Sequence, residues 1–223
     1  VFDFASGATM VVHLRMSGRL LIMPTPAAVK RAGKFVLASP HERVRFVLDH
    51  NLLVFDDTRV FGRVWYLPPG LNINEISGIA TLGPEPLEGL SPTYLQARFA
   101  QKKQPLKLTL LDQTIIAGIG NIYADEVLHL AGLNPNRPAC SLAHSEIERL
   151  IFQIEQVLAQ AIALGGSSIR DYTNAEGVNG NYQAEAFVYG RKGKVCKHCQ
   201  CLIERIKLGG RSTHFCPACQ PTP

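Results

Sequence analysis

Residues 1–67 form a series of short runs in which apolar and polar side chains alternate, separated by turn-forming residues. Alternation with a period of two predicts strands that bury one face and expose the other. In one run, Val44 and Phe46 fall on one face, whereas Arg43 and Arg45 fall on the other. The pattern predicts part of an antiparallel β-sandwich in this region.

The period changes after a linker at residues 68–89 that contains Pro and Gly. From residue 90 onward, apolar positions recur at helical spacing. A stretch at 166–192, rich in Gly, Asn and Ser, has no sustained period and is expected to be a long functional loop. Residues 90–190 are therefore predicted to be a helical domain that carries this loop, and the whole chain is placed in the α+β class.

Capping residues mark the expected starts of two helices. Ser91 precedes Pro92, a combination that is favoured at a helix N-terminus. Ser145 and Glu148 have the spacing of a capping box, followed by an apolar stripe. We therefore expect one helix to begin at Pro92 and a long amphipathic helix to begin just after Ser145.

A helix–turn–helix is predicted between these two helices. A helix near residues 105–112 is followed by Gly118 and Gly120, which permit a tight turn, and a second helix is expected from Asn121 to about Ala131. The start of that second helix presents unpaired backbone N–H groups that suit a phosphate. On these residues alone, ordinary structural packing is the alternative interpretation.

Basic residues are concentrated at the end of the chain. Residues 191–223 carry seven Lys or Arg against one acid, a net charge of +6, which leaves −1 for the rest of a chain whose total is +5. Four thiolates with one zinc ion would lower the charge of the tail to about +4. A basic segment on a near-neutral body predicts a polyanionic partner, most often nucleic acid. A solvated basic tail is the alternative.

Five of the six cysteines lie in this tail, and the sixth is Cys140. Four of them follow the spacing CxxC-x16-CxxC, which is typical of tetrahedral zinc: Cys196, Cys199, Cys216 and Cys219. The intervening stretch is expected to return as a hairpin with Gly209 and Gly210 at its turn. We predict one structural Zn²⁺ ion, with free or redox-active thiols as the alternative and Cys201 as a bystander.

No apolar run is long enough for a membrane span, and no signal-peptide pattern opens the chain, which predicts a soluble, cytoplasmic protein. The sequence begins at Val1, already inside a predicted strand. We therefore expect that an N-terminal segment precedes it.

Several segments, kept in one order along the chain, resemble motifs of the bacterial formamidopyrimidine-DNA glycosylase (Fpg/MutM) family. They are HLRMSGRL (13–20), DTRVFG (57–62), LGPEPL (82–87), DQTIIAGIGNIYADEVL (112–128), GGSS (165–168), VYGRKG (188–193) and GGRSTHFCPACQ (209–220). The resemblance implies an N-terminal β-sandwich, a helical domain with a helix-two-turn-helix, and a C-terminal zinc finger at 191–223. It implies a monomeric base-excision-repair enzyme that removes oxidised purines, such as 8-oxoguanine and formamidopyrimidines, from double-stranded DNA.

The chemistry of that family implies a second expectation. Its nucleophile is an N-terminal proline, assisted by an adjacent glutamate and by a lysine, and the AP lyase activity cuts the strand by β- and δ-elimination. The residues from Val1 onward match none of the three. We therefore expect this chain by itself to be inactive and the full-length form to be active. A catalytically inactive protein that binds damaged DNA is the alternative.

The resemblance implies that three residues act as a wedge in the DNA helix. Met16, Arg59 and Phe61 are similar to residues that enter the space left by a rotated-out base, where Arg59 hydrogen-bonds the orphaned base. Apolar wedges and an arginine suit these tasks. From the residues alone, Met16 and Phe61 could equally be core residues.

The remaining site residues implied by the resemblance are contacts to DNA. They are His41, Arg59, Lys102, Lys107, Asn121, Tyr189 and Arg211. Arg211, at the tip of the predicted zinc hairpin, is expected to grip the phosphates beside the lesion and to donate the proton in δ-elimination. An arginine fork suits bidentate phosphate contact.

Overall fold

The computed structural model describes residues 1–24, 39–167 and 181–222. Residues 168–180 of the long loop expected at 166–192, and residues 34–38 of a strand expected at 34–39, lie outside the described residues.

The chain folds into two compact units. One contains Val1–Ala80 and Leu164–Gln183, and the other contains Thr81–Ala163 and Ala184–Pro223. The zinc-finger segment therefore shares a compact unit with the main helices. The N-terminal strands belong to the other unit.

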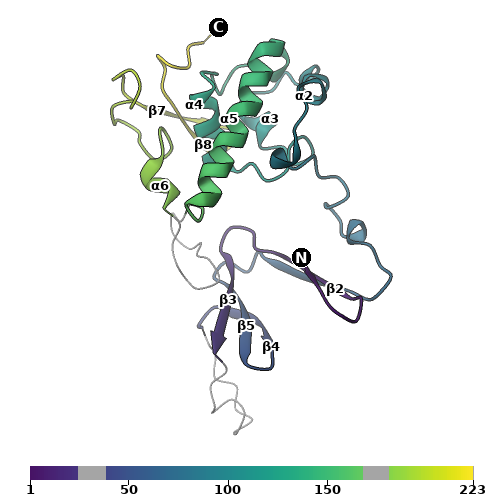
Figure 1. Cartoon of the computed structure of the whole chain (residues 1–223). Helices are drawn as coiled ribbons and strands as arrows, with labels where there is room; N and C mark the ends of the chain where they lie inside the picture. The colour runs from purple at the N-terminus through teal and green to yellow at the C-terminus, as the bar shows by residue number, and fades with distance from the viewer. Residues whose placement is uncertain (25–38, 168–180, 223) are drawn as a thin grey trace. The chain divides into compact units, whose positions relative to one another are not determined.

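The first unit is built from two antiparallel three-stranded sheets, with the orders β1-β2-β6 and β3-β5-β4 (Figure 1). The strands are β1 (Phe2–Asp3), β2 (Thr9–His13), β3 (Gly18–Pro24), β4 (Glu42–Val47), β5 (Asn51–Asp57) and β6 (Arg63–Leu67). The predicted antiparallel arrangement of the N-terminal region is confirmed.

Strand β5 is the buried centre of the second sheet. Every residue from Leu52 to Asp57 is buried, and β5 has a neighbouring strand on each edge. The strand ends in two adjacent buried carboxylates, Asp56 and Asp57. Buried carboxylates require hydrogen-bond partners, so the end of β5 is tied to the loops around it.

Helices form most of the second unit, and the last two strands form a hairpin (Figure 1). The helices are α2 (Pro92–Phe99), α3 (Leu106–Leu110), α4 (Asn121–Leu130) and α5 (His144–Ala163); a short helix, α6 (Tyr182–Glu185), lies at the boundary of the two units. Three 3-10 turns are η1 (Ile73–Glu75), η2 (Pro86–Glu88) and η3 (Ala139–Ser141). No described helix combines the length and the apolar character that a bilayer crossing requires.

The start of α2 confirms one capping prediction, and the start of α5 corrects the other. The Ser91 side chain accepts a hydrogen bond from the backbone of α2, with Pro92 in its first turn. Helix α5, however, begins at His144, so Ser145 and Glu148 are not its capping box. Instead, the N–H of Ala143 donates to Glu146 at 2.8 Å. A cap of this kind needs only the acid three residues along, and an alanine before the helix gives no sequence signal for it.

The turn between α3 and α4 follows the prediction. Gly118 has a φ of +77°, which a glycine adopts without strain. Gly120 precedes α4 and has no side chain to cap it. The N–H groups of the first turn of α4 are therefore not satisfied by a cap side chain.

Strands β7 (Glu204–Leu208) and β8 (Arg211–Phe215) pair antiparallel, with Leu208 opposite Arg211. Gly209 and Gly210 connect them, with φ values of +52° and +79°. Two successive positive φ values are typical of the tight turns that join hairpin strands. The predicted hairpin is confirmed, and its turn places Arg211 directly at the tip.

Candidate metal centre and nucleic-acid interface

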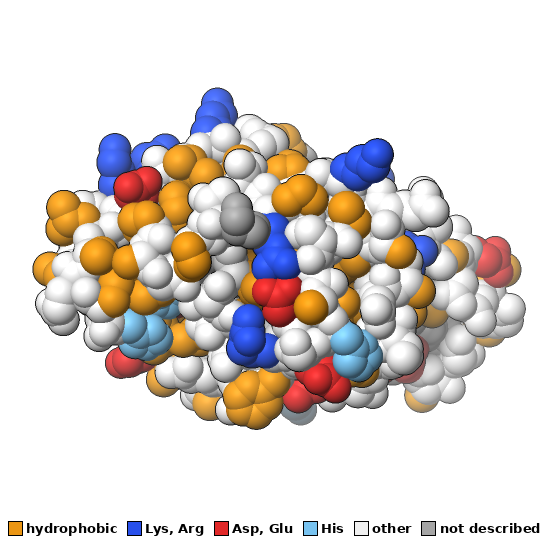
Figure 2. Space-filling model, turned by 90° about the horizontal axis from the view of Figure 1, so that it is seen from above, with side chains coloured by type: hydrophobic (Ala, Val, Ile, Leu, Met, Phe, Trp, Pro, Cys, Tyr) orange, Lys and Arg blue, Asp and Glu red, His pale blue; other side chains and the backbone are white. Residues whose placement is uncertain are grey.

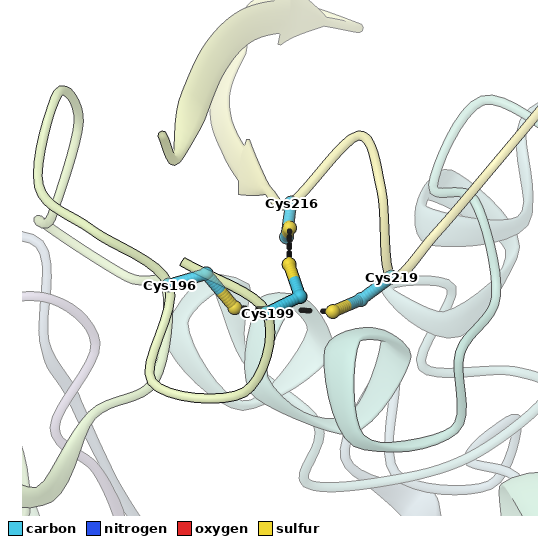
Figure 3. A group of neighbouring side chains, drawn as sticks. All are labelled: Cys196, Cys199, Cys216 and Cys219. Carbon is cyan, nitrogen blue, oxygen red and sulfur yellow. Dashed lines mark hydrogen bonds between the residues drawn. The ribbon is translucent and has the colours of Figure 1, made fainter. Parts of the chain in front are cut away.

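The four cysteines of the CxxC-x16-CxxC pattern come together at the base of the β7–β8 hairpin. Their sulfur atoms all lie within 4.8 Å of one another, and the side chains point toward a common centre (Figure 3). The Sγ atoms of Cys196 and Cys219 are 3.8 Å apart, and those of Cys199 and Cys216 are 3.4 Å apart. Cys201 is exposed and does not belong to this group.

This sulfur cluster fits a tetrahedral zinc ion. Zn–S bonds of about 2.3 Å place the ligand sulfurs of a tetrahedron about 3.8 Å apart. Hydrogen bonds from the backbone N–H of Cys201, and then from the thiols of Cys216 and Cys219, lower the pKa of Cys199 to about 6. One sulfur is thus a thiolate at neutral pH, which is the form that binds metal. The four cysteines hold one structural zinc ion.

Two buried polar side chains behind the cluster connect it to α4. His129, in the last turn of α4, has Nε2 4.0 Å from Cys196 Sγ and Nδ1 3.2 Å from Gln220 Oε1. Burial lowers the pKa of His129 to about 4, so the ring is neutral. Gln220 accepts from the N–H of Cys216 and donates to the carbonyl of Leu133. Groups of this kind fix the orientation of metal ligands, and the sequence analysis missed both.

Lys107 is placed differently from the expectation. Its side chain is 0% exposed, and its Nζ lies 2.7 Å from Asp125 Oδ1. The same ammonium donates to the carbonyl of Ser212 at 2.8 Å and to Thr213 Oγ1 at 3.0 Å. Burial lowers the pKa of Lys107, and the neighbouring Asp125 carboxylate opposes that shift. An ammonium with these partners and no exposed surface serves the hairpin rather than a phosphate.

The Asp125 carboxylate holds the hairpin from its other oxygen as well. Asp125 Oδ2 accepts from the backbone N–H of His214 at 2.8 Å and lies 3.2 Å from His214 Nδ1. Lys107 belongs to α3 and Asp125 to α4, so one buried ion pair joins both helices to β8. This pair fixes the strand that begins with Arg211.

Asn121 connects the start of α4 to the same strand. Its Nδ2 lies 3.2 Å from the Ser212 carbonyl and 3.4 Å from the hydroxyl of Tyr189. The Tyr189 ring contacts the ring of His214 at a centroid distance of 4.9 Å. The structure thus brings the expected contacts Asn121 and Tyr189 together beside the hairpin.

A buried carboxylate also sets the position of Tyr189. Glu126 is fully buried and accepts backbone hydrogen bonds from Phe187, Val188 and Tyr189, at 2.7 to 2.9 Å. Burial raises the pKa of Glu126, and these three N–H donors offset only part of that shift. Glu126 and Asp125 were not predicted as functional residues, since acids inside a helix carry no signal of the partners they meet.

Arg211 itself is exposed at the hairpin tip. Its guanidinium makes no hydrogen bond or ion pair with any other described residue, so its donors face solvent. Other basic side chains do not form one patch on the face seen from above, where Lys and Arg lie scattered among hydrophobic and uncharged side chains (Figure 2).

The three expected wedge residues lie together in the first unit. Met16 is in the β2–β3 turn, and Arg59 and Phe61 are in the β5–β6 loop. The guanidinium carbon of Arg59 lies 4.8 Å from the centre of the Phe61 ring, and Arg59 Nη1 lies 3.5 Å from Met16 Sδ. Met16 is 68% exposed and Phe61 is 51% exposed, so neither is a core residue.

His41 and Lys102, the last two expected contacts, are both partly exposed. His41 precedes β4, and its carbonyl accepts from the N–H of Asp57 at 2.9 Å. Lys102 Nζ lies 3.5 Å from Asp112 Oδ2, and the lysine side chain keeps 37% of its surface exposed. Each retains surface for a contact with a phosphate.

Comparison with known protein families matches three parts of this chain. Residues 1–64 match the formamidopyrimidine-DNA glycosylase N-terminal domain, and residues 82–173 match the formamidopyrimidine-DNA glycosylase H2TH domain. Residues 193–222 match the zinc finger found in FPG and IleRS.

Similar proteins and structures agree with these matches. Formamidopyrimidine-DNA glycosylase of Gloeobacter violaceus is 49% identical over 97% of this chain and 74% of its own length, and that of Thermosynechococcus vestitus is 47% identical over 96% and 74%. The crystal structure of the MutM (Fpg) protein from Thermus thermophilus has a TM-score of 0.86 at 40% identity, covering 100% of this chain and 79% of that one. A Lactococcus lactis Fpg in complex with abasic-site DNA has a TM-score of 0.83 at 33% identity, covering 96% and 76%. The domain matches, the identity and the cysteine cluster together show that the chain belongs to the formamidopyrimidine-DNA glycosylase family.

Proposed function

We propose that this protein acts in base excision repair as a DNA glycosylase with AP lyase activity on oxidised purines in duplex DNA. The observation that carries the proposal is the exposed Arg211 on a hairpin that zinc and a buried ion pair hold in place. The Lactococcus lactis relative has been captured with DNA containing Fapy-dG or an abasic site, and a MutM protein with DNA containing carbocyclic 8-oxo-G. These ligands support damaged duplex DNA as the substrate class.

The second unit supplies the proposed contacts to the DNA backbone. The guanidinium of Arg211 has two parallel donors free for a phosphate, and charge-assisted bonds of that geometry are strong. The uncapped start of α4 adds backbone N–H groups and the positive end of a helix dipole. Asn121 and Tyr189 lie beside this helix start and extend the phosphate site. Arg211 is also the proposed proton donor in δ-elimination.

The first unit supplies the proposed base-directed contacts. A nucleotide that rotates out of the helix leaves an unstacked gap, which is costly unless another group fills it. Met16 and Phe61 present exposed apolar surface for this purpose, and Arg59 presents donors to the unpaired base. Arg59 also stacks on Phe61, so the two side chains are expected to enter the gap together.

Borohydride trapping tests the chemistry of the proposal. A lyase of this type joins a protein amine to C1′ of the damaged nucleoside as a Schiff base, which borohydride reduces to a stable adduct. An adduct between duplex containing 8-oxoguanine and a form of the protein that carries the expected N-terminal proline would support the glycosylase–lyase. Tight binding without any adduct would instead support a damaged-DNA-binding protein that lacks catalysis.

Substitution of Arg211 by alanine is expected to weaken binding to duplex containing an abasic-site analogue by about tenfold, since one desolvated arginine–phosphate contact is lost. The slope of log K against log salt should fall in magnitude by about 1. Fluorescence anisotropy at several salt concentrations measures both. Arg205→Ala is the matched control, because Arg205 is exposed on β7, away from the tip. Equal losses in the two variants would contradict a specific role for Arg211.

A further inference from the structure

The buried carboxylate of Asp57 joins the two loops that carry the proposed wedge. Asp57 Oδ1 accepts from Ser17 Oγ at 2.6 Å and from the N–H of Arg59 at 3.2 Å. Its Oδ2 accepts from the N–H of Gly62 at 2.8 Å. Ser17 directly follows Met16, and the backbone of residues 59–62 carries Arg59 and Phe61. One side chain with 1% exposure thus holds both loops.

Both loops contain backbone conformations that need such support. Arg15 has a φ of +56° and Val60 a φ of +59°, and each directly neighbours a wedge residue. A left-handed conformation is unfavourable for most residues, and especially for a β-branched valine. Strained positions of this kind persist only where surrounding contacts fix them, and they occur often at functional sites.

Two close approaches further limit the loops. A Cβ atom on Gly18 would lie 2.3 Å from the carbonyl oxygen of Leu14 and 2.9 Å from the Phe55 ring. A Cβ atom on Gly62 would lie 2.3 Å from the same ring. The Phe55 ring thus sits against Gly18 and Gly62. Asp57, two residues along β5, accepts the hydrogen bonds from Ser17, Arg59 and Gly62. Packing on the Phe55 ring sets the distance of each loop from β5, and the Asp57 carboxylate sets the direction of the loop backbone.

The carboxylate is ionised at neutral pH. Burial by itself would raise the pKa of Asp57, but the hydrogen bonds from Ser17, Gly62, Arg59 and Phe61 outweigh burial and lower it. An ionised carboxylate has acceptor sites on both oxygens and no donor. It is therefore suited to an environment in which every neighbour donates.

We propose that Asp57 is the positioning residue of the wedge: by accepting hydrogen bonds from both loops, it holds Met16, Arg59 and Phe61 in the geometry that enters damaged DNA. This role rests on the proposed function of the wedge. This role explains why an acid is buried at the end of β5. Among the expected DNA-binding residues, its side chain contacts only the backbone of Arg59.

The test compares Asp57→Asn with Asp56→Asn. An asparagine at position 57 keeps one acceptor but turns a donor N–H₂ toward a backbone N–H in either orientation, so at least one loop loses its anchor. Asp56 is an equally buried carboxylate one residue away, and it accepts from Arg19 Nε at 2.9 Å and from Ser39 Oγ instead of the wedge loops. The second variant therefore matches the burial and the charge change without touching the wedge.

Two readouts separate positioning from general stability. The first is hydrogen exchange of the free protein, in which Asp57→Asn should accelerate exchange in residues 15–17 and 58–62, whereas Asp56→Asn should leave these segments unchanged. The second is the ratio of affinities for duplex with an abasic-site analogue and for undamaged duplex. We expect Asp57→Asn to lower this ratio at least about tenfold and Asp56→Asn to keep it within about twofold, at temperatures where both are folded.

Ser17→Ala provides a graded third variant. It removes the 2.6 Å bond but leaves the backbone donors of Arg59 and Gly62, so the affinity ratio should fall by less than in Asp57→Asn. Equal ratios for Asp57→Asn and Asp56→Asn, or unchanged exchange in the loops, would overturn the positioning role. If instead the unsubstituted chain bound both duplexes equally, or Met16→Ala left its ratio unchanged, the proposed wedge function itself would fall, and with it this inference.

Discussion

Substitution of Cys216 by serine is expected to abolish stoichiometric zinc binding and to unfold the β7–β8 hairpin. The apolar core of this segment is small: its buried cluster consists of Val188, Cys196, Ile203 and Cys216, and two of these are zinc ligands. Structural zinc contributes about 10–16 kcal/mol of apparent binding free energy in zinc-finger peptides. A serine leaves three thiolates and an incomplete site. The loss should exceed the average cost of a point substitution, which is about 1 kcal/mol.

Zinc content by atomic absorption and amide exchange of residues 204–215 measure this outcome. We expect about one zinc ion per chain for the unsubstituted protein and far less for Cys216→Ser, with rapid exchange throughout the hairpin. Cys201→Ser is the matched control, because Cys201 is an exposed cysteine of the same segment that lies outside the sulfur cluster. A full zinc complement in Cys216→Ser, or a loss of zinc in Cys201→Ser, would contradict the assigned ligand set.

Substitution of Lys107 by methionine is the second change with a large expected effect. Methionine fills a similar volume but leaves Asp125 Oδ1 buried without its cation. Removing one partner of a buried ion pair costs about 3–5 kcal/mol, because an uncompensated charge remains. The carbonyl of Ser212 also loses a donor at the base of the hairpin tip. Denaturant unfolding should therefore show a loss of about 3–5 kcal/mol in the free energy of unfolding.

The double variant Lys107→Met with Asp125→Asn is the control for this result. It removes both charges, while the asparagine carbonyl still accepts from the N–H of His214, so much of the lost stability should return. The salt dependence of DNA binding gives a second criterion. Because the Lys107 ammonium has no exposed surface, the salt slope of the folded single variant should stay unchanged. A loss in the free energy of unfolding below about 1 kcal/mol, or a salt slope reduced by about 1, would instead support a direct contact between Lys107 and a DNA phosphate.

Local sequence signals predicted the elements of this fold well. Alternating strands, the Ser91 cap, the Gly118 turn and the Gly209–Gly210 hairpin each depend on residues close together in the chain, where backbone preferences are strong. The zinc ligands were also predictable, since two-residue spacing restricts how a pair of cysteines meets one ion. The start of α5 was missed by two residues because Ser145 and Glu148 have the same spacing as the true cap at Ala143 and Glu146.

Contacts between distant segments account for what the sequence could not predict. Three acids show this: Asp57, Asp125 and Glu126. Nothing in the sequence marks them, yet each is buried and accepts hydrogen bonds from a distant segment. For Asp125, the donor His214 lies 89 residues away in the chain. The environment of Lys107 could not be predicted from the sequence for the same reason. A lysine in a basic protein suggests a surface contact, and only the position of β8 reveals its buried partners.

Hydrogen exchange of the zinc-loaded protein, with and without duplex that carries an abasic-site analogue, tests the central claim most directly. That claim is that the zinc-held hairpin and the wedge loops both contact damaged DNA. It predicts that the duplex slows exchange in residues 14–18, 58–62 and 208–213, and that an undamaged duplex protects the hairpin but not the wedge loops. Protection absent from the hairpin, or equal protection of the wedge loops by both duplexes, would contradict the account.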